Sequence, residues 1–204
     1  GDDSTYIEAG YKYSKNFFGY HYTYNAPLYP IFLSLPISFL GINLPLLKIT
    51  SVLFTLLQIV FLFRAFYQRL PSLVLFPSLF IIAVNTQFAY YASQTYNEAF
   101  FCFFQALFFY VVFLLTDNIQ AHGNNLRATW KYWLLLGAVS FLLSISKNVA
   151  VLGVASLVVF FLLRGNYFAI LLTAASYLFF RVPYELFQYY VWGVKSQYQS
   201  QSSQ

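Results

Sequence analysis

Residues 1–30, GDDSTYIEAGYKYSKNFFGYHYTYNAPLYP, set two adjacent carboxylates at the start of a helical pattern and then lead through two prolines into apolar sequence. Half of the chain's six acidic residues, Asp2, Asp3 and Glu8, lie in this stretch. A carboxylate can cap a helix by accepting hydrogen bonds from its free amide groups, so Asp3 could cap a helix from about residue 4 to residue 18. One cap does not require two carboxylates, and the acidic pair at the water edge of a membrane is therefore a candidate reacting centre.

The composition predicts an all-α protein that crosses a membrane several times. Of its 204 residues, 60% are hydrophobic and 8% are charged, whereas soluble domains carry roughly 25% charged residues. The net charge of +5 does not indicate nucleic-acid binding, because the basic residues stand singly at the ends of apolar segments, as orientation in a lipid bilayer requires. Cys102 is the single cysteine, so the chain forms no internal disulfide.

The apolar segments divide the chain into three parts. Residues 1–25 form an extracytoplasmic loop with a juxtamembrane helix, residues 26–192 a transmembrane helical module, and residues 193–204 a polar tail or the start of a loop. Spanning a ~30 Å hydrocarbon layer takes about 20 apolar residues, so several segments must include their aromatic flanks. The chain begins with glycine and without a signal-peptide pattern, and we expect it to be a fragment of a longer protein, cut just after a membrane helix. The expected segments are 26–41, 49–66, 72–91, 98–116, 132–146, 148–163 and 166–180.

The lysines and arginines indicate which segments cross. If every segment crosses, the basic loops lie on the same side as Asp2. If segment 26–41 does not cross, they lie on the opposite side, which the positive-inside rule makes cytoplasmic. Three prolines within that segment favour a broken helix at the membrane interface. The basic residues concerned are Arg64, Arg69, Arg127, Lys131 and Arg164. In this arrangement the non-cytoplasmic face carries Asp2, Asp3, Glu98, Lys147 and Arg181.

These residues suit the displacement of a lipid phosphate from a sugar. A carboxylate can accept the proton of an attacking hydroxyl or amine, or two carboxylates can share a divalent cation. Lys147 and Arg181 could hold phosphate oxygens, the arginine through two parallel hydrogen bonds and the lysine as a point charge. The sequence thus predicts a catalytic acidic pair and a set of substrate-binding residues. The catalytic residues are Asp2 and Asp3, and the substrate-binding residues are Glu98, Lys147 and Arg181.

Five motifs occur in an order that resembles a known family. The chain carries DDSTYIEAG, a loop ending in NAPLYP, then RAFYQR, SQTYNEAFF and LLSISKNVAVL. This order resembles the N-terminal module of the GT-C membrane glycosyltransferases. It is most similar to the branch that contains the protein O-mannosyltransferases and the lipid A aminoarabinose transferases. The resemblance covers nearly the whole chain apart from its tail, and its specificity lies in the order and separation of the motifs.

The resemblance implies a polyprenyl-phosphate sugar donor, a lipid, glycan or protein acceptor, and an inverting transfer on the outer side of a bacterial inner membrane. Asp2 matches the family's first-loop aspartate, its base or acceptor-binding carboxylate, and Asp3 stands where Asp or Glu usually follows. Glu98 matches the acidic position of the second outer loop, which holds a divalent metal ion in some members. Lys147 matches a basic residue near the donor phosphate. Departures from the family pattern in NAPLYP and at Asp3 leave the subfamily and the acceptor open.

Other interpretations remain open at several positions. His21 lies among tyrosines, which is typical of an interfacial aromatic belt, and Lys147 and Arg181 could instead reach lipid head groups. Gln58 and Gln105 are isolated amides that more often make interhelical hydrogen bonds. The alternative function is a lipid-sugar flippase or a small-molecule transporter, which needs ionisable groups near the bilayer midplane. The charges of this chain gather at segment ends, which favours the transferase.

Overall fold

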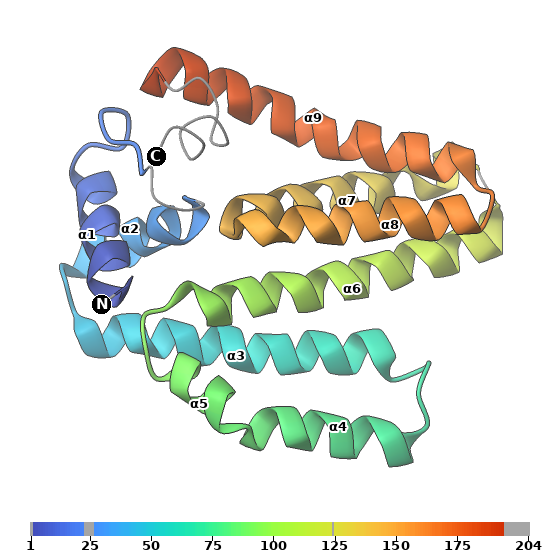
Figure 1. Ribbon diagram of the computed structural model, residues 1–204, viewed down its shortest axis with the longest axis horizontal. Helices are drawn as coiled ribbons and strands as arrows, with labels where there is room; N and C mark the ends of the chain where they lie inside the picture. The colour runs from blue at the N-terminus through green and yellow to red at the C-terminus, as the bar shows by residue number, and fades with distance from the viewer. Residues whose placement is uncertain (1, 23–26, 124, 194–204) are drawn as a thin grey trace.

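The computed structural model describes residues 2–22, 27–123 and 125–193, and all regular elements among them are helices (Figure 1). By length and composition, 4 helices can cross a membrane, and a bent pair of shorter helices raises the number of spans to as many as 5. The chain is therefore a multi-pass membrane protein. The predicted all-α class is confirmed at this level.

The helices fall into three groups by length. The four long ones are α3 (Leu44–Phe66), α6 (Asn97–His122), α7 (Leu126–Ser146) and α9 (Tyr167–Trp192). The bent pair is α4 (Ser72–Val84) and α5 (Thr86–Ala92), which meet at an angle of 56°. The short elements are α1 (Asp2–Lys15), α2 (Leu28–Leu40), the 3-10 helix η1 (Asn148–Ala150) and α8 (Val151–Leu163).

Asparagines determine where four of these helices begin. Each accepts a hydrogen bond from one of the first backbone N–H groups of the following helix, which have no partner inside the helix itself. These caps are Asn43 for α3, Asn85 for α5, Asn125 for α7 and Asn166 for α9. The turns of the bundle are thus encoded locally.

The bundle has two chemically different ends. Figure 1 shows the long helices side by side, with α6 between α3 and α7 and with α1 and α2 across one end. We call this end, where α6 begins and α7 ends, the α1 end. The opposite end, where α3 and α8 end, is called the arginine end. Its charged residues are Arg64, Arg69, Asp117, Arg127, Lys131 and Arg164.

Helix α2 is too short to cross a membrane. Its 13 residues extend for about 20 Å at 1.5 Å per residue, against a hydrocarbon thickness of ~30 Å. The sequence had suggested a broken helix, but the helix continues through Pro36 without a break. Tyr29, Leu33 and Ile37 recur every four residues on its buried face, and the helix packs against α1.

The first helix begins earlier than predicted. It extends from Asp2 to Lys15, and the expected range was 4–18. Asp3 therefore lies inside the first turn, and its predicted role as the helix cap is wrong. A carboxylate in the first turn still complements the positive end of the helix dipole. The chain turns after Lys15 because the Asn16 side chain accepts the Gly19 N–H at 2.9 Å.

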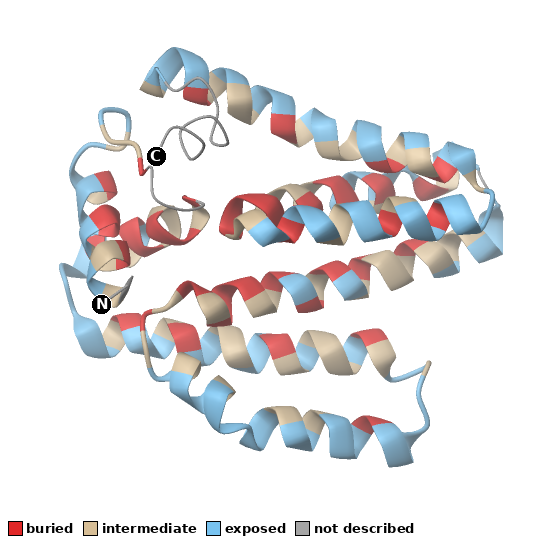
Figure 2. Ribbon diagram, viewed as in Figure 1, coloured by how far each residue is buried: buried red, intermediate tan, exposed pale blue. Residues whose placement is uncertain are grey.

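Buried residues concentrate near the α1 end and along α6 and α7, whereas α4 and much of α8 and α9 are exposed (Figure 2). The exposed side chains are largely apolar: Leu73, Leu163 and Leu171 are 87%, 83% and 65% exposed. Helices that face lipid carry such side chains because hydrocarbon is their solvent. The outer helices thus present the surface expected of membrane spans.

Gly137 allows α7 and α9 to pack closely, and Gly137→Ala tests this contact. An added methyl group would lie 2.3 Å from the backbone oxygen of Ser176, so the two helices would have to separate. Overpacking of this kind costs roughly 1–3 kcal/mol. We expect a lower midpoint of thermal unfolding for the variant in detergent.

The matched control is Gly153→Ala in α8. Its methyl group would find its nearest neighbour, Leu143 Cδ2, at 3.7 Å, an ordinary contact distance. Alanine in a helix interior is favoured over glycine by about 1 kcal/mol, so this variant should be as stable as the wild type or more stable. If both variants unfold alike, the close approach of α7 and α9 is wrong.

The orientation of the bundle gives a second prediction. We expect the arginine end to face the cytoplasm, because cytoplasmic loops carry the excess of basic residues. In a background without Cys102, an impermeant thiol reagent applied to intact cells should label Asp2→Cys and leave Arg127→Cys unlabelled until the cells are permeabilised. Labelling of both positions from one side would contradict the orientation.

Candidate functional site

Tyr29 lies at the centre of the α1 end. Its side chain is fully buried in α2, and its ring centroid lies 5.4 Å from that of Tyr6 in α1 and 5.3 Å from that of Phe100 in α6. Burial raises the pKa of the Tyr29 hydroxyl above its usual range, and the carboxylates of Asp3 and Glu98 raise it further. Tyr29 thus joins α1, α2 and α6 through ring contacts.

Four buried polar atoms at this end have no hydrogen-bonding partner. They are the Tyr29 hydroxyl, Asp3 Oδ1, Ser51 Oγ and Asn97 Oδ1. The Ser51 hydroxyl is close enough to lower the pKa of Tyr29, but the two groups do not reach hydrogen-bonding geometry. Buried polar atoms are almost always paired with protein, water or ligand. A water molecule or a polar ligand would satisfy these atoms on α1, α2, α3 and α6.

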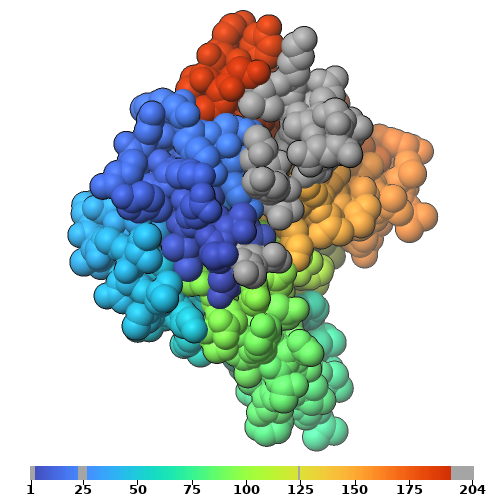
Figure 3. Space-filling model, turned by 60° about the vertical axis from the view of Figure 1, so that its left-hand side comes forward, coloured from blue at the N-terminus to red at the C-terminus, as the bar shows by residue number. Residues whose placement is uncertain are grey.

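Glu98 and Lys147 form an ion pair beside this group. Lys147 Nζ lies 3.1 Å from Glu98 Oε1, with the two side chains 40% and 33% exposed. Glu98 stands in the first turn of α6, where the helix dipole favours a carboxylate, and Lys147 directly follows the last residue of α7. The pair joins the ends of two adjacent helices. Figure 3 turns the α1 end forward and shows α1 at its surface.

Arg181 belongs to a different cluster. It is buried in α9 and pairs with Glu185 one turn along the same helix. Gln188, also buried, donates to the Tyr184 hydroxyl at 3.0 Å and lies 3.4 Å from the His21 ring nitrogen. None of the contacts described for Arg181 joins it to Glu98 or Lys147. The structure therefore pairs Glu98 with Lys147 and leaves Arg181 apart from them.

Two predicted features of the site receive no structural account. The Asp2 side chain lies outside the described residues, although its backbone begins α1. Within the described ranges, no group of three His, Cys, Asp or Glu residues could hold a metal ion. Glu98 already faces the Lys147 ammonium group, which disfavours a second cation. The divalent metal at Glu98 stays a prediction, because the Asp2 side chain, one of its candidate partners, lies outside the described residues.

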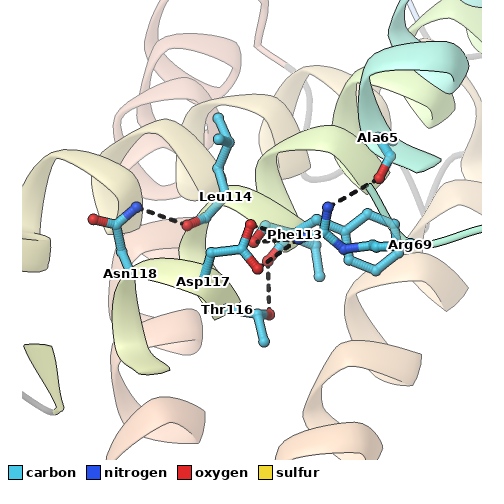
Figure 4. Close-up of polar contacts among 8 residues, drawn as sticks. Ala65, Arg69, Phe113, Leu114, Thr116, Asp117 and Asn118 are labelled. Carbon is cyan, nitrogen blue, oxygen red and sulfur yellow. Dashed lines mark hydrogen bonds and ion pairs between the residues drawn. The ribbon is translucent and has the colours of Figure 1, made fainter. Parts of the chain in front are cut away.

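An ion pair at the arginine end was missed by the sequence analysis (Figure 4). Arg69 Nη2 lies 2.5 Å from both carboxylate oxygens of Asp117, and Nη1 donates to the Ala65 carbonyl oxygen at 3.1 Å. The guanidinium group also lies 4.3 Å from the centre of the Phe113 ring. These contacts fasten the turn after α3 to α6. The signal in the sequence was a single acidic residue among the five basic residues of this end.

No known family model, no curated protein and no solved structure matches this chain. The resemblance to the GT-C enzymes therefore depends on the order of the motifs alone.

Tyr29→Phe tests whether the buried hydroxyl lacks a partner. A buried polar group without a hydrogen bond costs roughly 1–3 kcal/mol, so its removal should raise the free energy of unfolding of the purified protein, or leave it unchanged. Denaturation in detergent measures this quantity. A marked loss of stability would show that the hydroxyl has a partner.

Tyr13→Phe is the matched contrast. The Tyr13 hydroxyl accepts the Tyr22 backbone N–H at 3.1 Å in a buried position. Its loss leaves that N–H unpaired, which should cost roughly 1–3 kcal/mol. The two Tyr→Phe changes are thus expected to shift stability in opposite directions, or at least by clearly different amounts.

Proposed function

We propose that the chain is part of a membrane glycosyltransferase that moves a sugar from a polyprenyl-phosphate donor to an acceptor on the extracytoplasmic face. The observation that carries the proposal is the Glu98–Lys147 ion pair at the α1 end, where the Tyr29 hydroxyl and one oxygen of Asp3 are buried without partners. These residues come from α1, α2, α6 and the end of α7. The order of the family-like motifs supports the same function.

The acidic pair at the start of α1 supplies the base. Asp2 is the first choice by its motif position, and Asp3 has a buried carboxylate oxygen without a partner. A carboxylate can serve as a general base. It takes the proton of the acceptor hydroxyl while that oxygen forms a bond to the anomeric carbon of the sugar. The bond between this carbon and the phosphate oxygen breaks, and its electron pair leaves with the polyprenyl phosphate.

Lys147 stabilises the leaving phosphate. Its pair with Glu98 is partly exposed, and exposed pairs contribute only about 0–1 kcal/mol. The ammonium group can therefore exchange the carboxylate for a phosphate oxygen at little cost. Glu98 is then free to accept hydrogen bonds from hydroxyl groups of the sugar or the acceptor.

Asp2→Asn and Asp3→Asn test the base in the full-length protein. Asparagine keeps the size of the side chain but removes the basic oxygen, and general-base catalysis contributes typically 10²–10⁴-fold. At least one of the two changes should lower turnover by roughly that factor while donor binding is retained. The assay is transfer of radiolabelled sugar from its polyprenyl phosphate in detergent, with donor binding measured separately.

Glu8→Gln is the control for charge on the same helix. Glu8 is exposed and pairs with Lys12 at 2.6 Å on the surface of α1, so turnover should not change. Lys147→Gln should weaken donor binding first. Full turnover in both Asp→Asn variants would contradict the assignment of the base. If Glu8→Gln lowered turnover as much as the Asp→Asn changes, the loss would reflect the net charge of the helix and not general-base catalysis.

A further inference from the structure

A groove runs between α6 and α8. One cavity of about 590 Å³ opens at the arginine end, and a second of about 260 Å³ continues it toward the α1 end. Both are lined by Phe108, Phe109 and Ser156, which makes them parts of one groove. Helix α8 packs mainly on α9 and α7, so its side toward α6 is left open.

The length of the groove matches one leaflet of a bilayer. Along α8 its lining extends from Leu152 to Arg164, which corresponds to about 18 Å at 1.5 Å per residue. Half of a ~30 Å hydrocarbon layer is about 15 Å. The walls between these two residues are mainly phenylalanine and aliphatic side chains. The groove is therefore apolar and about as long as one acyl chain in a leaflet.

The mouth of the groove is cationic. Arg164 lines it together with the exposed amides Gln68 and Gln120. Arg69 is also present, but Asp117 neutralises its charge. For Arg164 no ion pair with a carboxylate occurs in the described part of the chain, and its guanidinium group lies 5.1 Å from the Phe160 ring centre. The mouth therefore carries one uncompensated positive charge beside two hydrogen-bonding amides.

We infer that this groove binds one anionic phospholipid from the leaflet at the arginine end. The phosphate group contacts Arg164 and the amides of Gln68 and Gln120, and an acyl chain lies along Phe108 and Phe109. Arginine suits phosphate because its planar donors form two parallel hydrogen bonds. A free phosphate would leave the apolar length of the groove unused. A zwitterionic phospholipid would bring a quaternary ammonium group with its phosphate, and the net positive charge of the mouth would stay uncompensated. The site lies at the opposite end of α6 from Glu98 and does not depend on the proposed function.

The test measures lipid binding to the purified full-length protein in a neutral detergent, by native mass spectrometry. Phosphatidylglycerol and phosphatidylcholine with the same acyl chains are the probes. We expect one phosphatidylglycerol to be retained in preference to phosphatidylcholine. Arg164→Gln should lower its affinity about tenfold, the factor that corresponds to 1.4 kcal/mol, and Ser156→Phe should lower it by narrowing the groove.

Arg127→Gln is the matched control, since Arg127 belongs to the same end but does not line the groove. Its affinity for phosphatidylglycerol should equal that of the wild type. Equal losses in Arg127→Gln and Arg164→Gln would overturn the site in favour of diffuse attraction to basic residues. Equal binding of the two lipids, no retained lipid, or displacement by millimolar inorganic phosphate would also overturn it. Thermal unfolding of each variant confirms that the protein compared is folded, and Ser156→Phe tests the groove without a change of charge.

Discussion

The packing of α6 between α3 and α7 is the contact on which the rest of the structure depends. Lipid tails are as apolar as leucine, so membrane helices associate through close packing and hydrogen bonds instead of the hydrophobic effect. Phe100, Phe104 and Phe108 recur every four residues along α6 and are buried. The ring of Phe54 in α3 lies 4.9 Å from that of Phe100. On the other side, Asn97 donates to the Ser146 carbonyl oxygen at the end of α7.

The two carboxylates of α6 each pair with a basic residue. Glu98 lies in the first turn, where the positive end of the helix favours a carboxylate. Asp117 lies in the second half of the helix, and Arg69 contacts both of its carboxylate oxygens. The two pairs are exposed to a similar extent, but Arg69 also donates to the Ala65 carbonyl oxygen and lies over the Phe113 ring. This difference leaves Lys147 available for a ligand and Arg69 committed to structure.

The sequence predicted the helices better than their ends. Segment 98–116 corresponds to a helix that extends to His122, because the polar run after Leu115 continues the helix. Thr116 and Asn118 donate to the carbonyl oxygens four residues earlier. Apolar content predicts only the part of a helix that lies in lipid. It does not predict polar turns whose side chains hydrogen-bond to the backbone carbonyl groups of the same helix. The start of α1 was placed too late for another reason, since Asp3 was taken as its cap and lies inside its first turn.

The candidate site was predicted in part, and the free energies of its ion pairs explain the remainder. Tyr29 gave no signal, since its contacts join segments far apart in the chain. The sequence showed Arg181 as a cation. It also showed Glu185 four residues later, at the i+4 spacing at which opposite charges pair on a helix. The Arg181 side chain is only 9% exposed, although Glu185 is 33% exposed, and a buried cation that loses its partner is left without a compensating charge. Breaking the exposed pair of Lys147 costs about 0–1 kcal/mol. A phosphate arriving at the α1 end would therefore recruit Lys147 and leave Arg181 with Glu185.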